Sequence, residues 1–218
     1  MTVGSGKVTS DWGRTFDQFA VWRPLRLLRL LGPVVQGITL DRNTAGDAYF
    51  PTVHIHVLAV PFPVISLTMG QRLLDDSGAQ KQVMFSRHAE EFRVAVEGVR
   101  RQSSLSVDEP PGIVEVVRAL HDHAKNRHAD GHPPAVHEVG QSILVAAVCA
   151  EQDLVDEGTA VARSLLEVWP RTRLPLDWVN GRVWLDEVLG RARDAKDLAR
   201  VVDQQIGYHK LADIPNLI

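Results

Sequence analysis

Residues 33–69 have the sequence PVVQGITLDRNTAGDAYFPTVHIHVLAVPFPVISLTM, and their polarity alternates along much of this length. Successive side chains of a β-strand point to opposite faces of the sheet, so alternation with a period of two residues predicts strands. The connections between the alternating runs are short and rich in turn residues, which favours an antiparallel β-meander. The predicted strands are residues 34–40, 52–60 and 64–69.

The second predicted strand places two histidines, His54 and His56, on the same side of the sheet. Its opposite side is apolar and includes Val53, Ile55 and Val57. An antiparallel sheet commonly buries one face and leaves the other partly polar. Small hydroxyl residues of the second and third strands share the histidine side, so we predict a single polar surface. Its members are Thr52, His54, His56, Ser66 and Thr68.

Two short helices are predicted before the sheet. The first lies near residues 10–19, and the second runs from Pro24 to Gly32. Proline is favoured at the first position of a helix and glycine just past its end, and leucines recur between them at helical spacing. Arginines also recur there at every third residue. This pattern indicates either a basic helix that binds phosphates or an anionic surface, or a core helix whose arginines reach water along its edge. The candidate anion-binding residues are Arg23, Arg26 and Arg29.

The C-terminal half is predicted to be a helical bundle, because apolar residues recur there at helical spacing. Residues 102–112 have the composition of a linker or long loop and mark a candidate domain boundary. We therefore predict an α+β fold, in which a small antiparallel meander of about three strands, residues 33–69, follows short helices and precedes a helical half. The predicted domains are residues 1–102 and 112–218. We expect them to pack together as one unit, because the apolar face of the sheet needs more cover than the short helices offer.

The composition of the chain argues against several classes of protein. A net charge of −3 provides no strong field for nucleic acid or an anionic membrane, and we predict neither as a partner. The single cysteine, Cys149, excludes an internal disulfide and fits a reducing compartment, with a buried inert thiol as the expectation. Only five of the 24 basic residues are lysine, which suggests a bacterial protein, and residues 1–6 lack the apolar stretch of a targeting signal. We therefore predict a cytoplasmic protein.

The nine histidines make metal binding a hypothesis to consider. A His54-x-His56 pair on a strand points both imidazoles the same way, but a metal site needs further ligands with fixed geometry. The sequence has no recognised metal-binding, nucleotide-binding or nucleophile motif, although Ser66 or Thr68 beside His56 could form a nucleophile–base pair. We predict no catalytic residue, no metal and no cofactor. The candidate ligand-binding residues are His54, His56, Ser66 and Thr68.

Two classes of function fit these observations. The class we favour is a non-catalytic protein-binding module of the bacterial cytosol, of the immunity, adaptor or regulatory type, with another protein as its partner. The alternative is a ligand-binding protein or metal-dependent, hydrolase-like enzyme that uses the sheet face of His54 and His56. The exposed edges of a small sheet also leave a homodimer formed by edge pairing open.

Overall fold

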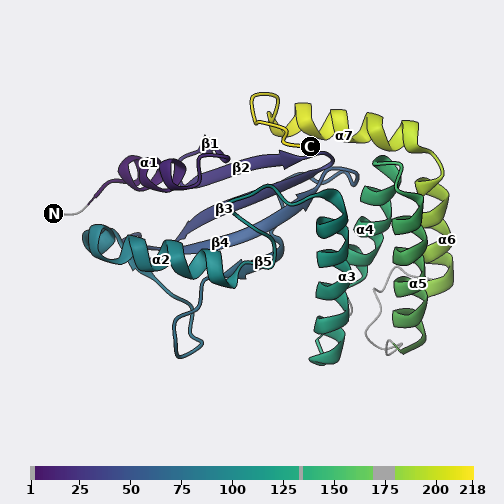
Figure 1. The fold of residues 1–218 in the computed structure, drawn as a ribbon, viewed down its shortest axis with the longest axis horizontal. Coiled ribbons are helices and arrows are strands. Elements are labelled where there is room, and N and C mark those ends of the chain that lie inside the picture. Colours follow the sequence, from purple (N-terminus) through teal and green to yellow (C-terminus); the bar gives the residue numbers. More distant parts are fainter. Residues whose placement is uncertain (1–2, 133–134, 169–179) are drawn as a thin grey trace. The chain divides into compact units, whose positions relative to one another are not determined.

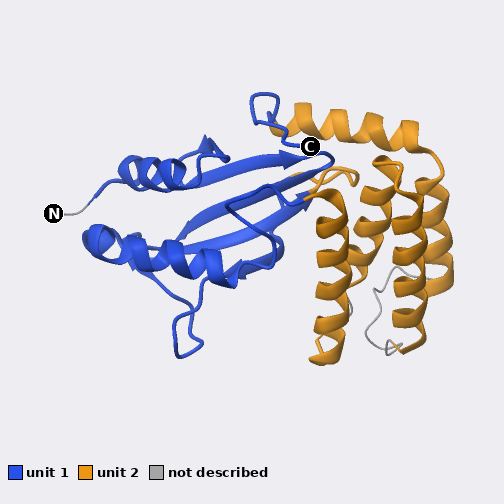
Figure 2. Ribbon diagram, viewed as in Figure 1, with its two compact units in different colours: residues 1–56, 64–111, 210–218 blue, residues 57–63, 112–209 orange. Residues whose placement is uncertain are grey.

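The computed structural model describes residues 3–132, 135–168 and 180–218, and the chain divides into two compact units. The first unit comprises residues 1–56, 64–111 and 210–218, and the second comprises residues 57–63 and 112–209 (Figure 2). The first contains the sheet and the second is helical, so the α+β fold class predicted from the sequence is confirmed. That residues 1–102 and 112–218 form two domains packed together stays a prediction.

The first unit is built on an antiparallel sheet, which has six strands among the residues that the structure describes. The order is β1-β2-β3-β4-β5, and β6 also pairs with β4. The predicted meander corresponds to β3, β4 and β5, but the sheet has more strands than the three predicted. The bounds are β1 Ala20–Arg23, β2 Arg26–Leu31, β3 Val34–Arg42, β4 Ala48–Val57, β5 Thr68–Arg72 and β6 Val83–Met84 (Figure 1).

The prediction of a helix from Pro24 to Gly32 is wrong, because this segment contains β2. Pro24 and Leu25 form the turn between β1 and β2, with Leu25 at a φ of 64°. Gly32, at a φ of 56°, and Pro33 form the turn between β2 and β3. The leucine spacing misleads because a short segment with leucines on both faces fits a buried strand as well as a helix. The proline and glycine that would begin and end a helix therefore form hairpin turns instead.

Two helices of the first unit, α1 (Ser5–Thr15) and α2 (His88–Gln102), share one core with the sheet. The ring of Trp12 stacks on Phe16 with centroids 5.7 Å apart and meets Tyr49 edge-on at 6.4 Å. A short 3-10 helix, η1 (Phe85–Arg87), precedes α2. The core therefore lies on the face of the sheet that carries Leu27, Ile38, Leu40, Tyr49 and Val53.

The C-terminal residues return to the first unit and extend the edge of β2. The N–H of Leu30 donates to the carbonyl oxygen of Pro215 at 2.9 Å, and the N–H of Leu217 donates to Leu30 at 3.0 Å. The amide oxygen of Asn216 accepts from the N–H of Gly32 at 3.0 Å. Since β1 pairs with β2 only as far as Leu28, this terminal segment occupies the remainder of that edge.

The second unit contains five helices within the described residues, at the positions that the apolar spacing predicts. Glycines allow close approach between them: a Cβ at Gly158 would lie 2.9 Å from Cγ1 of Ile143, and one at Gly140 would lie 3.2 Å from the Trp184 ring. The apolar spacing predicts a helix from Leu154 through Trp169, and Trp169 itself lies outside the described residues. The helices are α3 Ile113–Ala129, α4 Val136–Val148, α5 Gln152–Val168, α6 Gly181–Ala192 and α7 Ala195–His209.

Among the described residues, no helix combines the length and the apolar character needed to cross a membrane.

Candidate functional site

Three of the four predicted ligand-binding residues form one hydrogen-bonded chain. The N–H of Ser66 donates to Nδ1 of His56 at 3.1 Å, and Oγ of Ser66 lies 2.9 Å from the same nitrogen. Oγ of Ser66 also lies 3.0 Å from Oγ1 of Thr68. The fourth residue, His54, has a different partner, because its Nε2 lies 3.0 Å from Oγ1 of Thr39 on β3. The polar face thus holds two separate networks.

Both histidine side chains of this face are buried. His54 is 2% exposed and His56 is 1% exposed. A cavity of about 10 Å³ borders Val53, His54 and Ile55, which is room for roughly one water molecule. This cavity therefore admits no substrate of ordinary size to the His54 ring. The 64–67 segment, predicted as the start of a strand, forms no ladder, and Ser66 bonds to His56 instead.

Gly37 on β3 makes the space that the His54 ring fills. A Cβ at Gly37 would lie 2.4 Å from Nε2 of His54 and 2.8 Å from Cδ2 of Leu28. Real carbon atoms do not approach so closely, so a larger residue at this position must displace the ring. The glycine and the histidine are therefore a matched pair across β3 and β4.

Burial also determines the protonation state of His54. Loss of hydration lowers the pKa of its imidazole from 6.5 to about 4, and the positive charge of Arg26 acts in the same direction. The backbone of Ile55 and of Ser66 opposes this change only partly. His54 is therefore neutral at neutral pH.

The lowered pKa of His54 predicts a loss of stability in acid. Between about pH 6.5 and pH 4 the unfolded chain binds a proton at His54 and the folded chain does not. The free energy of unfolding therefore decreases as the pH is lowered through this range. The full effect is about 3 kcal/mol. Chemical denaturation at several pH values checks it, with His54→Gln as the control that removes one titrating group. An equally steep pH dependence in that variant would contradict the assignment.

The three arginines predicted to form a basic helical row do not form one. Arg29 is buried and points into the core, where its guanidinium donates to Oε1 of Gln36 at 2.8 and 3.0 Å. It also donates to the carbonyl oxygens of Ser106 at 2.7 Å and Glu109 at 3.0 Å. Burial lowers the pKa of Arg29 to about 10, which leaves it protonated. Its role is to hold the 103–111 segment against the sheet.

Arg23 and Arg26 have a different environment, because both are exposed on the β1–β2 hairpin. The register of the two strands places them directly opposite each other. The guanidinium of Arg23 lies over the ring of Trp22, 3.9 Å from its centroid. The helix prediction for this segment is thus wrong. The hairpin turn nevertheless brings together two of the three arginines that were predicted to bind an anion. Binding of an anion stays a prediction.

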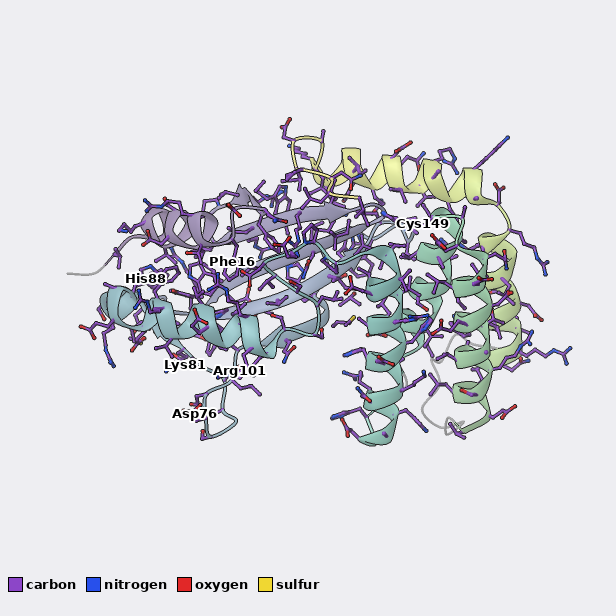
Figure 3. The ribbon with its side chains drawn as sticks, viewed as in Figure 1. Phe16, Asp76, Lys81, His88, Arg101 and Cys149 are labelled. Carbon is purple, nitrogen blue, oxygen red and sulfur yellow. The ribbon has the colours of Figure 1, made fainter. Side chains whose placement is uncertain are left out.

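A buried polar network that the sequence analysis missed joins α1, β4 and α2. Nε1 of Trp12 donates to the hydroxyl of Tyr49 at 3.1 Å, and that hydroxyl lies 2.8 Å from Nδ1 of His88. Nε2 of His88 lies 3.1 Å from Oδ2 of Asp11, and Figure 3 shows His88 at the beginning of α2. Asp11 and Trp12 are adjacent, but Tyr49 and His88 are far from them in sequence, so no local pattern could have linked the four.

The donors and acceptors of this network complement one another. The indole of Trp12 can only donate and the ionised carboxylate of Asp11 can only accept, so Nε2 of His88 is the donor to Asp11. The hydroxyl of Tyr49 accepts from Trp12 and also contacts Nδ1 of His88. Burial raises the pKa of Tyr49. Burial alone would raise the pKa of Asp11 as well, but hydrogen bonds from Lys7 and His88 outweigh it and lower that pKa. The polar atoms of the network bond to one another, which fits a structural role in holding α1, β4 and α2 together rather than a catalytic role.

α1 and β1 run side by side (Figure 1), and a hollow lies between them. Its volume is about 590 Å³, and its lining is mostly apolar. Gly13 allows the helix to approach the strand, because a Cβ there would lie 3.2 Å from Cγ2 of Val21. Val21 itself is 52% exposed. We call this feature the α1–β1 groove; it is lined by Gly6, Thr9, Ser10, Gly13, Arg14, Phe19, Val21, Trp22, Arg23 and Pro24.

Within residues 3–132, 135–168 and 180–218, no three or more His, Cys, Asp or Glu side chains are grouped closely enough to hold a metal ion. Comparison of the chain with protein-family models, with curated proteins and with solved structures finds no match. The geometry of the described residues is therefore the basis for any functional proposal.

Proposed function

We propose that this chain is a non-catalytic protein-binding module, and that its α1–β1 groove holds a segment of the partner protein. The observation that carries this proposal is an open groove of about 590 Å³ with a mostly apolar lining. Large exposed apolar side chains in a concave surface are typical of binding sites. Val21 supplies an exposed side chain and Trp22 a half-buried one. Aromatic and arginine residues are enriched where proteins bind each other.

The burial of the histidine face supports binding rather than catalysis. General-base or nucleophilic chemistry requires that a reacting atom come within hydrogen-bond distance of the catalytic group. His54 and His56 are buried against their own strands and neighbours, and the adjacent cavity has room for roughly one water molecule. The alternative hypothesis, an enzyme or ligand-binding protein that uses this face, is not supported by an observation comparable to the open groove.

We also propose that the module is a bacterial cytoplasmic protein of the immunity, adaptor or regulatory type. The arginine-rich composition and the single cysteine support this setting. Burial raises the pKa of the Cys149 thiol to about 11, so the thiol is protonated and unreactive at neutral pH.

A substitution in the groove tests the proposed function. Val21→Asp places a charge on the apolar wall, and Val94→Asp makes the same change on α2, where Val94 is 64% exposed. The experiment first captures a partner protein with the unaltered chain. The partner, once purified, should bind the unaltered chain reversibly. We expect Val21→Asp to weaken this binding at least about tenfold and Val94→Asp to leave it unchanged.

Thermal unfolding of each variant shows whether it folds. Equal binding of the purified partner to folded Val21→Asp and to the unaltered chain would contradict the proposal. The proposal would also be contradicted if no protein captured by the unaltered chain bound that chain reversibly after purification.

A further inference from the structure

We propose that the segment bound in the α1–β1 groove is acidic. Its carboxylates bind Arg23, which lines the groove, and Arg26, the cross-strand partner of Arg23, which lies outside the described lining. This inference depends on the proposed function, which it makes more specific by assigning the chemistry of the partner.

The first argument is the pairing of two like charges across the hairpin. Arg23 and Arg26 are direct cross-strand partners and both are exposed. Like charges in directly opposed positions destabilise a strand pair. Within the described residues, neither arginine forms an ion pair with a carboxylate of this chain. A carboxylate from outside the chain would relieve this repulsion.

The second argument is the placement of the Arg23 guanidinium. Its central carbon lies 3.9 Å from the centroid of the Trp22 ring, so one face of the group rests on an aromatic surface. This contact leaves the N–H groups at the edge of the guanidinium available. Those groups match the two oxygens of a carboxylate and can bind it in a bidentate manner. Contact with Trp22 also restricts the side chain before the ligand arrives, which reduces the entropy lost on binding.

The third argument is the charge of the groove as a whole. Its only charged lining residues are Arg14 and Arg23, and no Asp or Glu belongs to the described lining. The nearby carboxylate of Asp11 already accepts from Arg14 at 2.7 Å and from Lys7 at 2.8 Å. The fixed charges thus favour an occupant of negative charge, and complementary charges give an interface its specificity.

The form of β1 indicates that side chains, rather than an added strand, provide the recognition. The strand has four residues, its pairing with β2 shifts between Val21 and Arg23, and Pro24 follows it. Short length, irregular register and proline are features that protect a sheet edge from further strand pairing. The occupant therefore places an apolar side chain in the groove beside Val21 and carboxylates on the two arginines.

Selection from a random library of 12-residue peptides displayed on phage tests the inference. Peptides enriched on the unaltered chain should contain Asp or Glu next to a large apolar residue. Enrichment should disappear with Arg23→Gln/Arg26→Gln and persist with the control Arg93→Gln/Arg101→Gln, which changes two exposed arginines of α2.

The affinity of one selected peptide and of its Asn/Gln counterpart then provides the measurement. Fluorescence anisotropy should show binding of the acidic peptide weakened at least about tenfold by Arg23→Gln/Arg26→Gln, with a reduced dependence on salt. The amide counterpart should bind the unaltered chain and the double variant equally weakly. The double variant removes a repulsion between two arginines. The midpoint temperature of its thermal unfolding should therefore be no lower than that of the unaltered chain.

Three results would overturn the inference: no enriched peptide, enriched peptides without an acidic excess, or equal affinity of the acidic peptide for the double variant. Binding to anionic phosphatidylglycerol vesicles in place of the peptide would also overturn it. If Val21→Asp abolishes partner binding but Arg23→Gln/Arg26→Gln does not, the proposed function stands and the acidic occupant is wrong.

Discussion

Replacement of Arg29 by alanine should lower the free energy of unfolding by about 3–5 kcal/mol, because it removes the centre of a buried hydrogen-bond network. The guanidinium donates to Gln36, to Ser106 and to Glu109, and it lies 4.3 Å from the centroid of the Phe19 ring. Alanine leaves Oε1 of Gln36 and the carbonyl oxygen of Glu109 without the donor they have in Arg29, whereas the carbonyl oxygen of Ser106 keeps a hydrogen bond from Nε2 of Gln36. It also leaves a void beside Phe19. Chemical denaturation of the variant measures the loss.

Two further variants show whether the loss arises from the network. Arg101→Ala truncates an exposed arginine of α2 and should change the free energy of unfolding by about 0.5 kcal/mol or less. Arg29→Met/Gln36→Leu replaces both side-chain partners by apolar groups and should be more stable than Arg29→Ala. A cost below about 1 kcal/mol for Arg29→Ala would show that the network contributes little.

The substitution Gly37→Ala should destabilise the protein by about 2–3 kcal/mol, because the added carbon occupies the space of the His54 ring. The predicted contact of 2.4 Å with Nε2 cannot exist, so the ring must move and give up its hydrogen bond to Thr39. Leu28, at 2.8 Å from the same point, limits movement on the other side. Chemical denaturation measures the change in the free energy of unfolding.

A double-mutant cycle separates crowding from an intrinsic preference for glycine. His54→Ala removes the ring, so Gly37→Ala should cost at least about 1 kcal/mol less in that background than in the unaltered chain. An unchanged cost would show that the backbone at Gly37, rather than the imidazole, excludes a side chain.

The sequence predicts the middle of the sheet well but not its margins. Along β3 and β4 a strict alternation separates Val53 from His54, and this pattern determines which face each side chain occupies. The six residues of β2 have leucines on both faces and carry no such alternation, so their spacing favoured a helix. Whether that segment is strand or helix depends on pairing with β3, which is a tertiary interaction.

The candidate sites were predictable only where they depend on neighbours in sequence. Strand alternation predicted that His56, Ser66 and Thr68 would share a face. In the structure Ser66 precedes β5 and contacts His56 through its own N–H and hydroxyl. The burial of His56 does not follow, because it depends on what covers the face. The network of Asp11, Tyr49 and His88 joins residues from three elements, and each residue alone is unremarkable in its local sequence. Pairing of Arg23 with Arg26 required knowledge of the turn between them.

The return of the chain terminus to β2 has a consequence for synthesis on the ribosome. Residues 112–209 are translated before residues 210–218, so the edge of β2 at Leu30 gains its partner only after roughly 100 further residues have been added. At about 5–20 residues per second this takes roughly 5–20 s. During that interval the backbone of Leu30 lacks its final partners, and a newly made chain carries an open strand edge that another nascent polypeptide could occupy.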